Sequence, residues 1–229
     1  MQLTNFVTAA AFALPAFAQT PPEFQPGSQQ NLGVTFQPAL DITPGKVVAT
    51  TDVRTQPQIR APAGLPPTQK YMIFMIDIDV VQNGTATTVL HWFQPDMTLD
   101  PQTNLVVPPP QIDTANAAPY FGPGPPPGPA HRYVQALFAQ PGPPTQAFKL
   151  PSCFAAITQR SGRLGFDVQQ FVQVNGLQPA VAGNFLKSFN AASGPNLPPV
   201  APTATRLSSA AACAATGVQA AKRLVDVLW

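Results

Sequence analysis

Charged residues are scarce in this sequence. They make up 10% of its 229 residues, whereas soluble domains carry about 25%. The 12 Lys and Arg residues nearly balance the 10 Asp and Glu residues, which leaves a formal charge of +2, and no run of basic residues occurs. Nucleic acids and anionic membrane surfaces are bound by clustered basic side chains, so the sequence argues against both as partners. The hydrophobic content of 45% is ordinary and indicates a packed domain.

The residues that carry most enzyme chemistry are also few. The chain has two histidines, His91 and His131, two cysteines and a single glutamate, Glu23. It contains no Gly-x-Ser-x-Gly elbow, no Gly-Lys-Thr phosphate loop and no Cys/His cluster with metal-ligand spacing, so we expect neither a metal nor a cofactor. Asp77 and Asp79 form a carboxylate pair on a predicted strand, about 7 Å apart. No sugar-stacking aromatic residues flank them, which argues against glycosidase chemistry.

The first eighteen residues have the pattern of a secretory signal peptide. An apolar stretch from Phe6 to about Leu14 is followed by the small-residue pattern Ala16-Phe17-Ala18, after which we expect cleavage. An amphipathic or buried first element is the alternative. A membrane span is not, because the stretch is shorter than the about 20 residues that a span needs. The pattern predicts the secretory pathway, with secretion or a vesicle lumen as the destination.

Two further features suit that pathway. Cys153 and Cys213 could form a disulfide that closes a loop of about 60 residues, and two unrelated buried thiols are the alternative. Asn83-Gly84-Thr85 is a glycosylation sequon, which predicts Asn83 as a glycosylation site.

Hydrophobic periodicity predicts a mainly β domain. Apolar runs bounded by turn residues predict strands over 32–36, 46–50, 71–81, 89–93 and 132–138. Residues 101–130 hold ten prolines and are predicted to be a loop packed over a sheet. One internal helix is predicted, capped by Asp167 and ended at Asn175-Gly176. Many short strands, long Pro-rich loops and few peripheral helices predict two packed antiparallel sheets.

The chain is predicted to contain one folded domain. Residues 1–18 are the signal peptide, 19–31 an extended lead-in, 32–190 the β domain, and 191–229 a Pro- and Ala-rich carboxyl extension. A terminal helix is expected in that extension from about Ser208.

The most specific motif is YFGPGPPPGPAHRYV at residues 120–134. It resembles the signature of the phosphatidylethanolamine-binding protein family, in which a Tyr-x-Gly-Pro-x-Pro-Pro-x-Gly loop precedes His-Arg-Tyr. A second family motif, Asp-Pro-Asp-Ala-Pro followed by a Leu-His-Trp strand, is similar to residues 77–81 and 90–92, in the same order. Weaker similarities extend the resemblance over about 32–185.

The resemblance implies a β-sandwich with a small anion-binding cavity at one edge. In the family, this cavity is lined by the first aspartate of the second motif, the histidine of Leu-His-Trp, the His and Tyr of His-Arg-Tyr, and the proline loop. The matching residues here are Asp77, His91, Pro125, Pro126, His131 and Tyr133. Two imidazoles and a phenol can donate to phosphate or carboxylate oxygens, whereas Asp77 is expected to orient a histidine. Asp79 and Arg132 are expected to form an ion pair behind the site.

The chain also departs from the family pattern. Ile78 and Val81 replace both prolines of the aspartate motif, and the gap between Gly128 and His131 is one residue shorter than in many members. These differences leave room for a larger or more apolar ligand than a phospholipid head group.

The resemblance implies three candidate functions. The first is a binding module for a small anionic molecule or a lipid head group. The second is an inhibitor of a serine carboxypeptidase, which some family members block through an extended amino-terminal segment that is short here. The third is an accessory protein in fungal secondary metabolism that works with a biosynthetic enzyme and assists dimerisation of maleic-anhydride (maleidride-type) polyketides. We adopt the anion-binding function with the third as its most concrete form, and the sequence leaves both binding and catalysis open.

Overall fold

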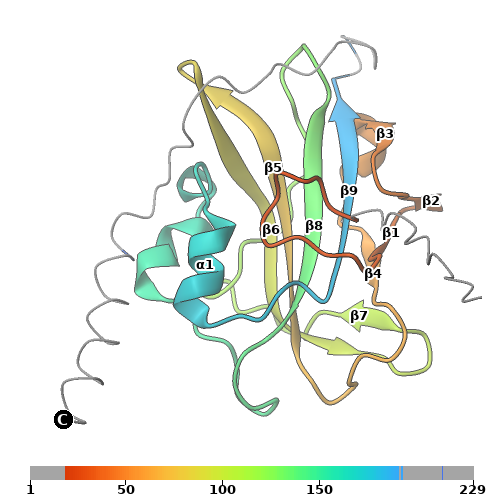
Figure 1. The fold of residues 1–229 in the computed structure, drawn as a ribbon, viewed down its shortest axis with the longest axis vertical. Coiled ribbons are helices and arrows are strands. Elements are labelled where there is room, and N and C mark those ends of the chain that lie inside the picture. The colour runs from red at the N-terminus through yellow and green to blue at the C-terminus, as the bar shows by residue number, and fades with distance from the viewer. Residues whose placement is uncertain (1–18, 191, 193–212, 214–229) are drawn as a thin grey trace, which may run out of the picture.

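The structure is a computed structural model that describes residues 19–190, 192 and 213. In this part of the chain, nine strands form one continuous sheet (Figure 1). The strands are β1 (Gly33–Phe36), β2 (Leu40–Asp41), β3 (Lys46–Ala49), β4 (Gln58–Arg60), β5 (Tyr71–Gln82), β6 (Thr85–Leu99), β7 (Leu105–Val107), β8 (His131–Ala139) and β9 (Ala182–Phe189). The helical elements are α1 (Val168–Asn175) and the 3-10 helices η1 (Thr50–Val53), η2 (Ser152–Thr158) and η3 (Arg160–Gly162). Within the described residues, no helix has the length and hydropathy needed to cross a membrane.

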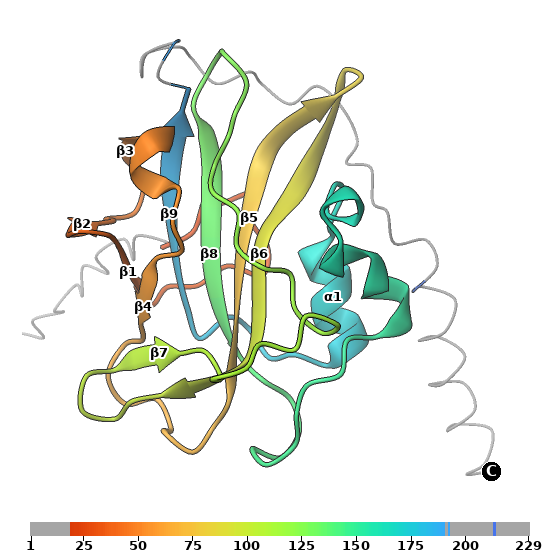
Figure 2. The same cartoon turned by 180° about the vertical axis from the view of Figure 1, so that it is seen from behind.

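The sheet is continuous because β6 belongs to both of its halves. The strand order is β2-β1-β4-β7-β6-β5-β8-β9-β3. Most of β6 pairs with β5, while Thr98 and Leu99 at its end pair with β7. All neighbours are antiparallel except β3, which runs parallel to β9. The mainly β fold is thus confirmed, with the two halves joined in one curled mixed sheet (Figure 1 and Figure 2).

β5 is buried on both faces because each face belongs to a separate core. Phe74 packs against Phe171 of α1, with ring centroids 5.1 Å apart, in the core that also contains Phe154 of η2. The adjacent residue Ile73 points the other way, into the core shared with Phe36 of β1. Two-sided burial explains why this strand reads as a continuous apolar run, without alternation.

Helix α1 begins and ends as the sequence predicts. The Asp167 carboxylate accepts a hydrogen bond from Gln170 N at 3.0 Å, which is the expected N-cap. Gly176 follows the helix with a φ of 61°, the left-handed conformation that glycine favours. Val168 and Phe171 face the core, which fixes the helix against the central strands (Figure 2).

A bulge carries β6 past a proline. The predicted strand stops at Phe93, because Pro95 has no amide to donate to a neighbouring strand. In the structure β6 continues to Leu99, with one extra residue inserted opposite β5 at residues 95–96. Asp96 takes a left-handed conformation with a φ of 59°, so the backbone turns out of the ladder where the proline could not pair.

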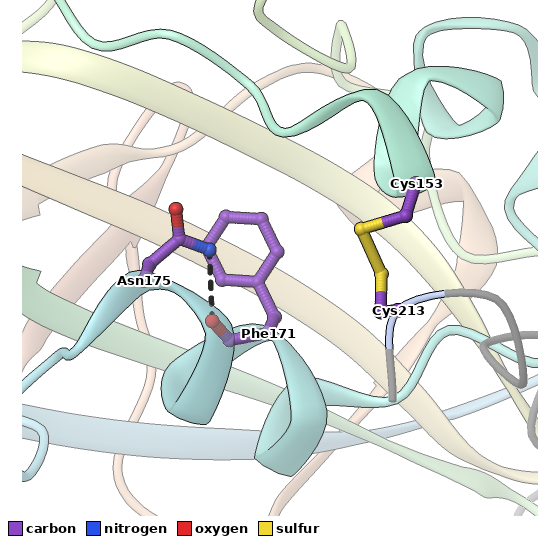
Figure 3. The surroundings of a disulfide bond; sticks show 4 residues. All are labelled: Cys153, Phe171, Asn175 and Cys213. Atoms are coloured by element: carbon purple, nitrogen blue, oxygen red, sulfur yellow. Dashed lines mark hydrogen bonds between the residues drawn. A yellow bond between two sulfur atoms is a disulfide. The ribbon is translucent and has the colours of Figure 1, made fainter. Parts of the chain in front are cut away.

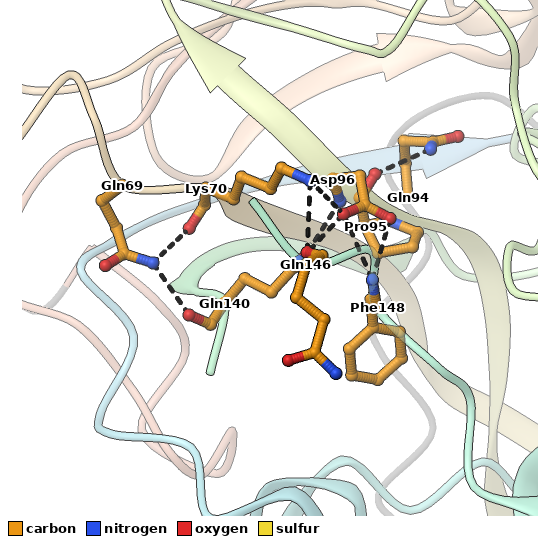
Figure 4. A network of polar contacts seen from close by, with 8 residues as sticks. All are labelled: Gln69, Lys70, Gln94, Pro95, Asp96, Gln140, Gln146 and Phe148. Carbon is orange, nitrogen blue, oxygen red and sulfur yellow. Dashed lines mark hydrogen bonds and ion pairs between the residues drawn. The ribbon is translucent and has the colours of Figure 1, made fainter. Parts of the chain in front are cut away.

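Asp96 is the centre of a polar network at this bulge (Figure 4). Its carboxylate contacts Lys70 Nζ at 3.0 Å, Gln140 Nε2 at 2.9 Å and the amide of Phe148 at 3.1 Å. In return, Asp96 N donates to Gln140 Oε1 at 2.7 Å. The network therefore joins the start of β5, the bulge in β6, and the segment after β8.

Four strands lie outside the sequence prediction. β7 falls at 105–107, inside the segment predicted to be a loop, so that prediction was wrong at these residues. β2 and β4 have two and three residues, too few to give a periodic pattern. β9 contains Gly183, Asn184 and Lys187, which interrupt the apolar alternation, yet it pairs with β8 over seven residues.

The segment predicted to be an extended lead-in packs on the domain. Phe24 is 1% exposed and belongs to the core beneath α1. Glu23 contacts Arg132 at 2.9 Å, and Gln19 N donates to Ser28 O at 3.0 Å. The predicted signal peptide at 1–18 and the predicted terminal helix from Ser208 lie outside the described residues, apart from Cys213.

Cys153 and Cys213 form a disulfide beside α1 (Figure 3). Their Cα atoms lie 5.4 Å apart, and their sequence separation is 60. The alternative of two unrelated thiols is therefore excluded. The bond attaches residue 213 to the start of η2.

Candidate functional site

Asp77 lies near the end of the buried part of β5, which runs from Tyr71 to Ile78. Its side chain is 3% exposed and lies on the same face of the strand as Ile73 and Met75. Its Oδ1 accepts from Asp79 N at 2.9 Å, and its Oδ2 contacts His131 Nδ1 at 2.9 Å. Both oxygens are thus engaged within the protein, and the contact with Nδ1 restricts the orientation of the His131 ring.

His131 is the first residue of β8 and lines the pocket. Cross-strand pairing of Asp77 with Tyr133 brings the start of β8 next to the aspartate. Since Nδ1 donates to Asp77, Nε2 is the donor left for a ligand. Burial disfavours the charged ring, but the hydrogen bond and charge of Asp77, with the charge of Asp79, outweigh it and raise the pKa of His131 above 6.5.

His91 occupies a second bulge of β6. Its neighbours Leu90 and Trp92 pair with consecutive residues of β5, so His91 is the extra residue. Its Nδ1 lies 2.9 Å from Phe121 O, and a carbonyl only accepts, so Nδ1 carries the hydrogen. In the neutral ring Nε2 is therefore an acceptor. Burial lowers the pKa of His91 below 6.5, despite the opposing effects of Phe121 O and Asp77.

Tyr133 is a buried core residue of β8 that also lines the pocket. Its ring meets the His91 ring edge to face, with centroids 5.0 Å apart. Burial, together with the nearby Asp77 charge, raises the pKa of Tyr133 far above its usual value, so the phenol stays neutral. Its buried hydroxyl makes no well-formed hydrogen bond within the described residues, which leaves it as an additional donor near the pocket.

Specific contacts hold the proline loop against the sheet. Phe121 N donates to His91 O at 3.0 Å, and the Tyr120 hydroxyl donates to Val53 O at 2.7 Å. Gly122 lies so close to the backbone of Arg54 that a Cβ atom would come within 2.9 Å of the Arg54 Cα. This close approach explains why the loop has glycine here.

These elements line an open pocket of about 680 Å³. All six residues predicted to bind a ligand line it, which brings both histidines of the chain to one place. The sequence analysis missed seven further lining residues. The complete lining is Asp77, Val80, Val89, His91, Phe121, Gly122, Gly124, Pro125, Pro126, His131, Tyr133, Arg160 and Ser161. Within the described residues, no group of three or more His, Cys, Asp or Glu side chains is arranged to hold a metal ion.

Phe121 and Arg160 form a wall of the pocket that sequence reasoning did not find. The Phe121 ring lies 4.0 Å from the His91 ring, centroid to centroid, and the Arg160 guanidinium lies 4.6 Å from the Phe121 centroid. Arg160 belongs to η3, about thirty residues after the motif that identified the other side chains. Phe121, in contrast, is the second residue of the motif at 120–134, so the motif itself could have identified Phe121 as a pocket residue.

The other predicted residues, Asp79, Arg132 and Asn83, do not line the pocket. Arg132 contacts Asp79 through Nη2 at 2.6 Å and Nε at 2.8 Å, and it also reaches Glu23 at 2.9 Å. Asn83 is exposed in the turn between β5 and β6, with a φ of 52°. Its exposure is compatible with the predicted glycosylation, which stays a prediction.

Comparisons with known proteins found a matching family model and similar proteins. Residues 25–192 match the family model described as phosphatidylethanolamine-binding protein. The chain is 39% identical over 200 residues to Phomoidride biosynthesis cluster protein N of Talaromyces stipitatus, covering 81% of this chain and 97% of the relative. A protein of the same description from a Fungal sp. is 35% identical over 117 residues, covering 50% and 51% of the two chains.

The fold is also similar to a solved structure described as carboxypeptidase Y inhibitor complexed with the cognate proteinase. The TM-score is 0.52 at 20% identity, covering 72% of this chain and 85% of the other. At this identity the likeness concerns the fold alone.

Proposed function

The chain belongs to the phosphatidylethanolamine-binding protein family, and we propose that its pocket binds a small carboxylate-bearing precursor of a maleidride-type polyketide and assists its dimerisation. Homology to phomoidride biosynthesis cluster protein N, at 39% identity over 81% of this chain, supports the pathway. The charges and donors of the pocket support the type of ligand.

The observation that carries the proposal is the contact between Asp77 and His131. It fixes the ring and favours its protonated form, so that Nε2 presents a charged N–H to the pocket. Hydrogen bonds between an ionised donor and a carboxylate are roughly twice as strong as neutral ones. A single imidazole can thereby hold a small anion in a chain that has few charges.

The same pocket has the groups needed to stabilise an enolate-like intermediate. His131 Nε2 and the Tyr133 hydroxyl are donors for an oxygen on which negative charge collects. His91 Nε2 has a lone pair and can accept a proton. The pKa values of His91 and His131 are moved in opposite directions, as is typical of a base and an acid in one site.

Titration calorimetry with maleate tests the binding step. We expect the native protein to bind maleate and His131→Ala to lose at least tenfold in affinity, because the charged donor is gone. His131→Gln keeps a neutral donor and should fall between the two. Thermal unfolding of each variant shows whether the fold is intact. Absence of binding to the native protein, or equal binding by an intact His131→Ala, would overturn the proposal.

The two other candidate functions are separated by the choice of probe. The family relation favours a lipid head group as the alternative ligand, and glycerophosphoethanolamine binding more tightly than maleate would support it. The function as a carboxypeptidase inhibitor is supported only by the similarity of the fold. Glu23 and Phe24 also attach residues 19–31 to the domain, so these residues do not form an extended arm.

A further inference from the structure

Arg160 is a cation of the pocket that makes no ion pair within the described residues. It lies at the start of η3, is exposed, and lines the same pocket as His131. Its guanidinium rests on the ring of Phe121, which in turn contacts the His91 ring. The His91 ring also meets the Tyr133 ring edge to face, so a continuous series of ring contacts connects Arg160 to Tyr133.

A second arginine stands next to it, also without a carboxylate partner in the described part of the chain. Arg163 is 4% exposed, and its guanidinium donates to Ile157 O at 2.9 Å and to Pro119 O at 2.7 Å. Burial and the charge of Arg160 lower the pKa of Arg163. The two positive charges therefore repel each other, and neither arginine makes an ion pair with an acidic side chain of the described residues, so an anion at Arg160 would relieve this repulsion.

The carboxylate of Asp77 cannot supply that anion. Its two oxygens accept hydrogen bonds from His131 Nδ1 and Asp79 N, so it is held at the His131 side of the pocket. Asp79, the next carboxylate on β5, is engaged by Arg132. The pocket thus has two cationic groups, of which His131 is matched with an acidic side chain and Arg160 is not.

We propose that Arg160 forms a second anion subsite, so that the ligand is a short dicarboxylate held at one end by His131 and at the other by Arg160. This inference rests on the proposed function, because it concerns the ligand of the same pocket. A guanidinium presents paired N–H groups that match a carboxylate. Because stacking on Phe121 already restricts the Arg160 side chain, less conformational entropy is lost when an anion binds. Arg160 is then a specificity residue, which selects ligands with two acid groups.

The test compares maleate with crotonate, a monocarboxylate of similar size, by titration calorimetry. We expect the native protein to bind maleate about tenfold more tightly than crotonate, since one charge-assisted contact is added. Arg160→Gln should lose most of this preference by weakening maleate binding, with little change for crotonate. Arg160→Lys, which keeps the charge but not the planar group, should restore part of it.

Lys149→Gln is the matched control. Lys149 is exposed, does not line the pocket, and its substitution changes the net charge by the same amount as Arg160→Gln. It should leave both affinities unchanged. If Lys149→Gln weakens maleate as much as Arg160→Gln does, the effect is one of overall charge and the subsite is rejected.

The remaining outcomes separate this inference from the proposed function. Crotonate and maleate binding equally to the native protein, with His131→Ala abolishing both, would reject the subsite and leave anion binding at His131 intact. An Arg160→Gln protein that binds maleate like the native protein would reject it as well. If neither acid binds the native protein, the proposed function fails and the subsite fails with it.

Discussion

The two histidines of this chain have different charge states because their partners differ. His131 donates to a carboxylate, which stabilises the imidazolium, whereas His91 donates to the Phe121 carbonyl in a more buried position. His131 therefore remains a charged donor to higher pH than an ordinary histidine, whereas His91 remains neutral to lower pH. The pocket obtains an acid and a base from one residue type.

This difference predicts how anion binding depends on pH. A ligand held by protonated His131 should bind well below the raised pKa of His131 and be released as pH increases through it. Asp77→Asn removes the charge that raises this pKa, so release should begin at lower pH. At acidic pH the variant should bind at least as well as the native protein, because a negative charge near the anion is gone.

The histidine Cε1–H resonances in proton NMR measure both pKa values directly, since the chain has only two histidines. We expect His131 to titrate above 6.5 and His91 below it. His91→Asn assigns the signals. A His131 signal that titrates unchanged in Asp77→Asn would contradict the role given to the carboxylate.

The sequence could predict part of this site but not all of it. Asp77, His131 and Tyr133 lie on strands whose periodicity indicates a shared face, and the motif places the proline loop beside them. Arg160 could not be found in this way, because η3 has three residues and no apolar period. Its place at the pocket depends on how the segment after β8 packs on Phe121, a long-range contact that leaves no local pattern.

At the scale of elements, the bulges of β6 decide where functional and structural polar groups lie. One bulge directs His91 toward the pocket, and the other gives Asp96 its left-handed conformation. Strand periodicity predicts the regular parts of β5 and β8. Strand periodicity fails at Pro95. There β6 continues because the bulge leaves Pro95 outside the hydrogen-bonded ladder, so no backbone N–H is required.

The Asp96 network predicts a stability effect remote from the pocket. Asp96→Ala would leave Lys70 Nζ and the Phe148 amide without their carboxylate partner and place alanine at a positive φ. We expect a loss of about 2–4 kcal/mol in the free energy of unfolding, measured by urea denaturation. Asp96→Asn tolerates the backbone conformation and should cost less.

The same network gives a pH signature. Burial favours the neutral acid, but hydrogen bonds from Gln140, Lys70 and Phe148 outweigh it and lower the pKa of Asp96 below 3.8. Its stabilising contribution should be complete above 3.8 and lost as pH falls through the lowered pKa. Asp52→Asn, a change at an exposed aspartate, serves as the control. Equal stabilities of Asp52→Asn and Asp96→Ala would contradict the structural role of Asp96.

At the scale of the whole molecule, contacts between distant segments close the fold. Residues 30–32 pair with Gly183 at the start of β9, and β3 runs parallel to β9 at the edge of the sheet. A mainly β class follows from strand and turn composition. Which short strand pairs with which does not, because β2 and β4 carry too few residues to specify a partner.

The Cys153–Cys213 disulfide is a covalent contact between two distant segments of the described residues. Removing it should lower the free energy of unfolding strongly. A double Cys153→Ser, Cys213→Ser variant removes a cross-link with a sequence separation of 60. The chain-entropy argument gives a loss of about 4 kcal/mol, because the unfolded chain gains the freedom of an open loop. Replacing both residues also avoids leaving a free thiol.

The double variant should lose stability without losing the pocket. Phe154 and Ile157 remain buried in the core and hold η2, which leads into Arg160, so maleate affinity should stay within about twofold of the native value. Thermal unfolding and maleate titration on the same preparation measure both quantities. An unfolding midpoint equal to that of the native protein would contradict the stabilising role of the bond. A lower midpoint accompanied by loss of maleate binding would show that the disulfide, rather than the core contacts of η2, positions the Arg160 wall.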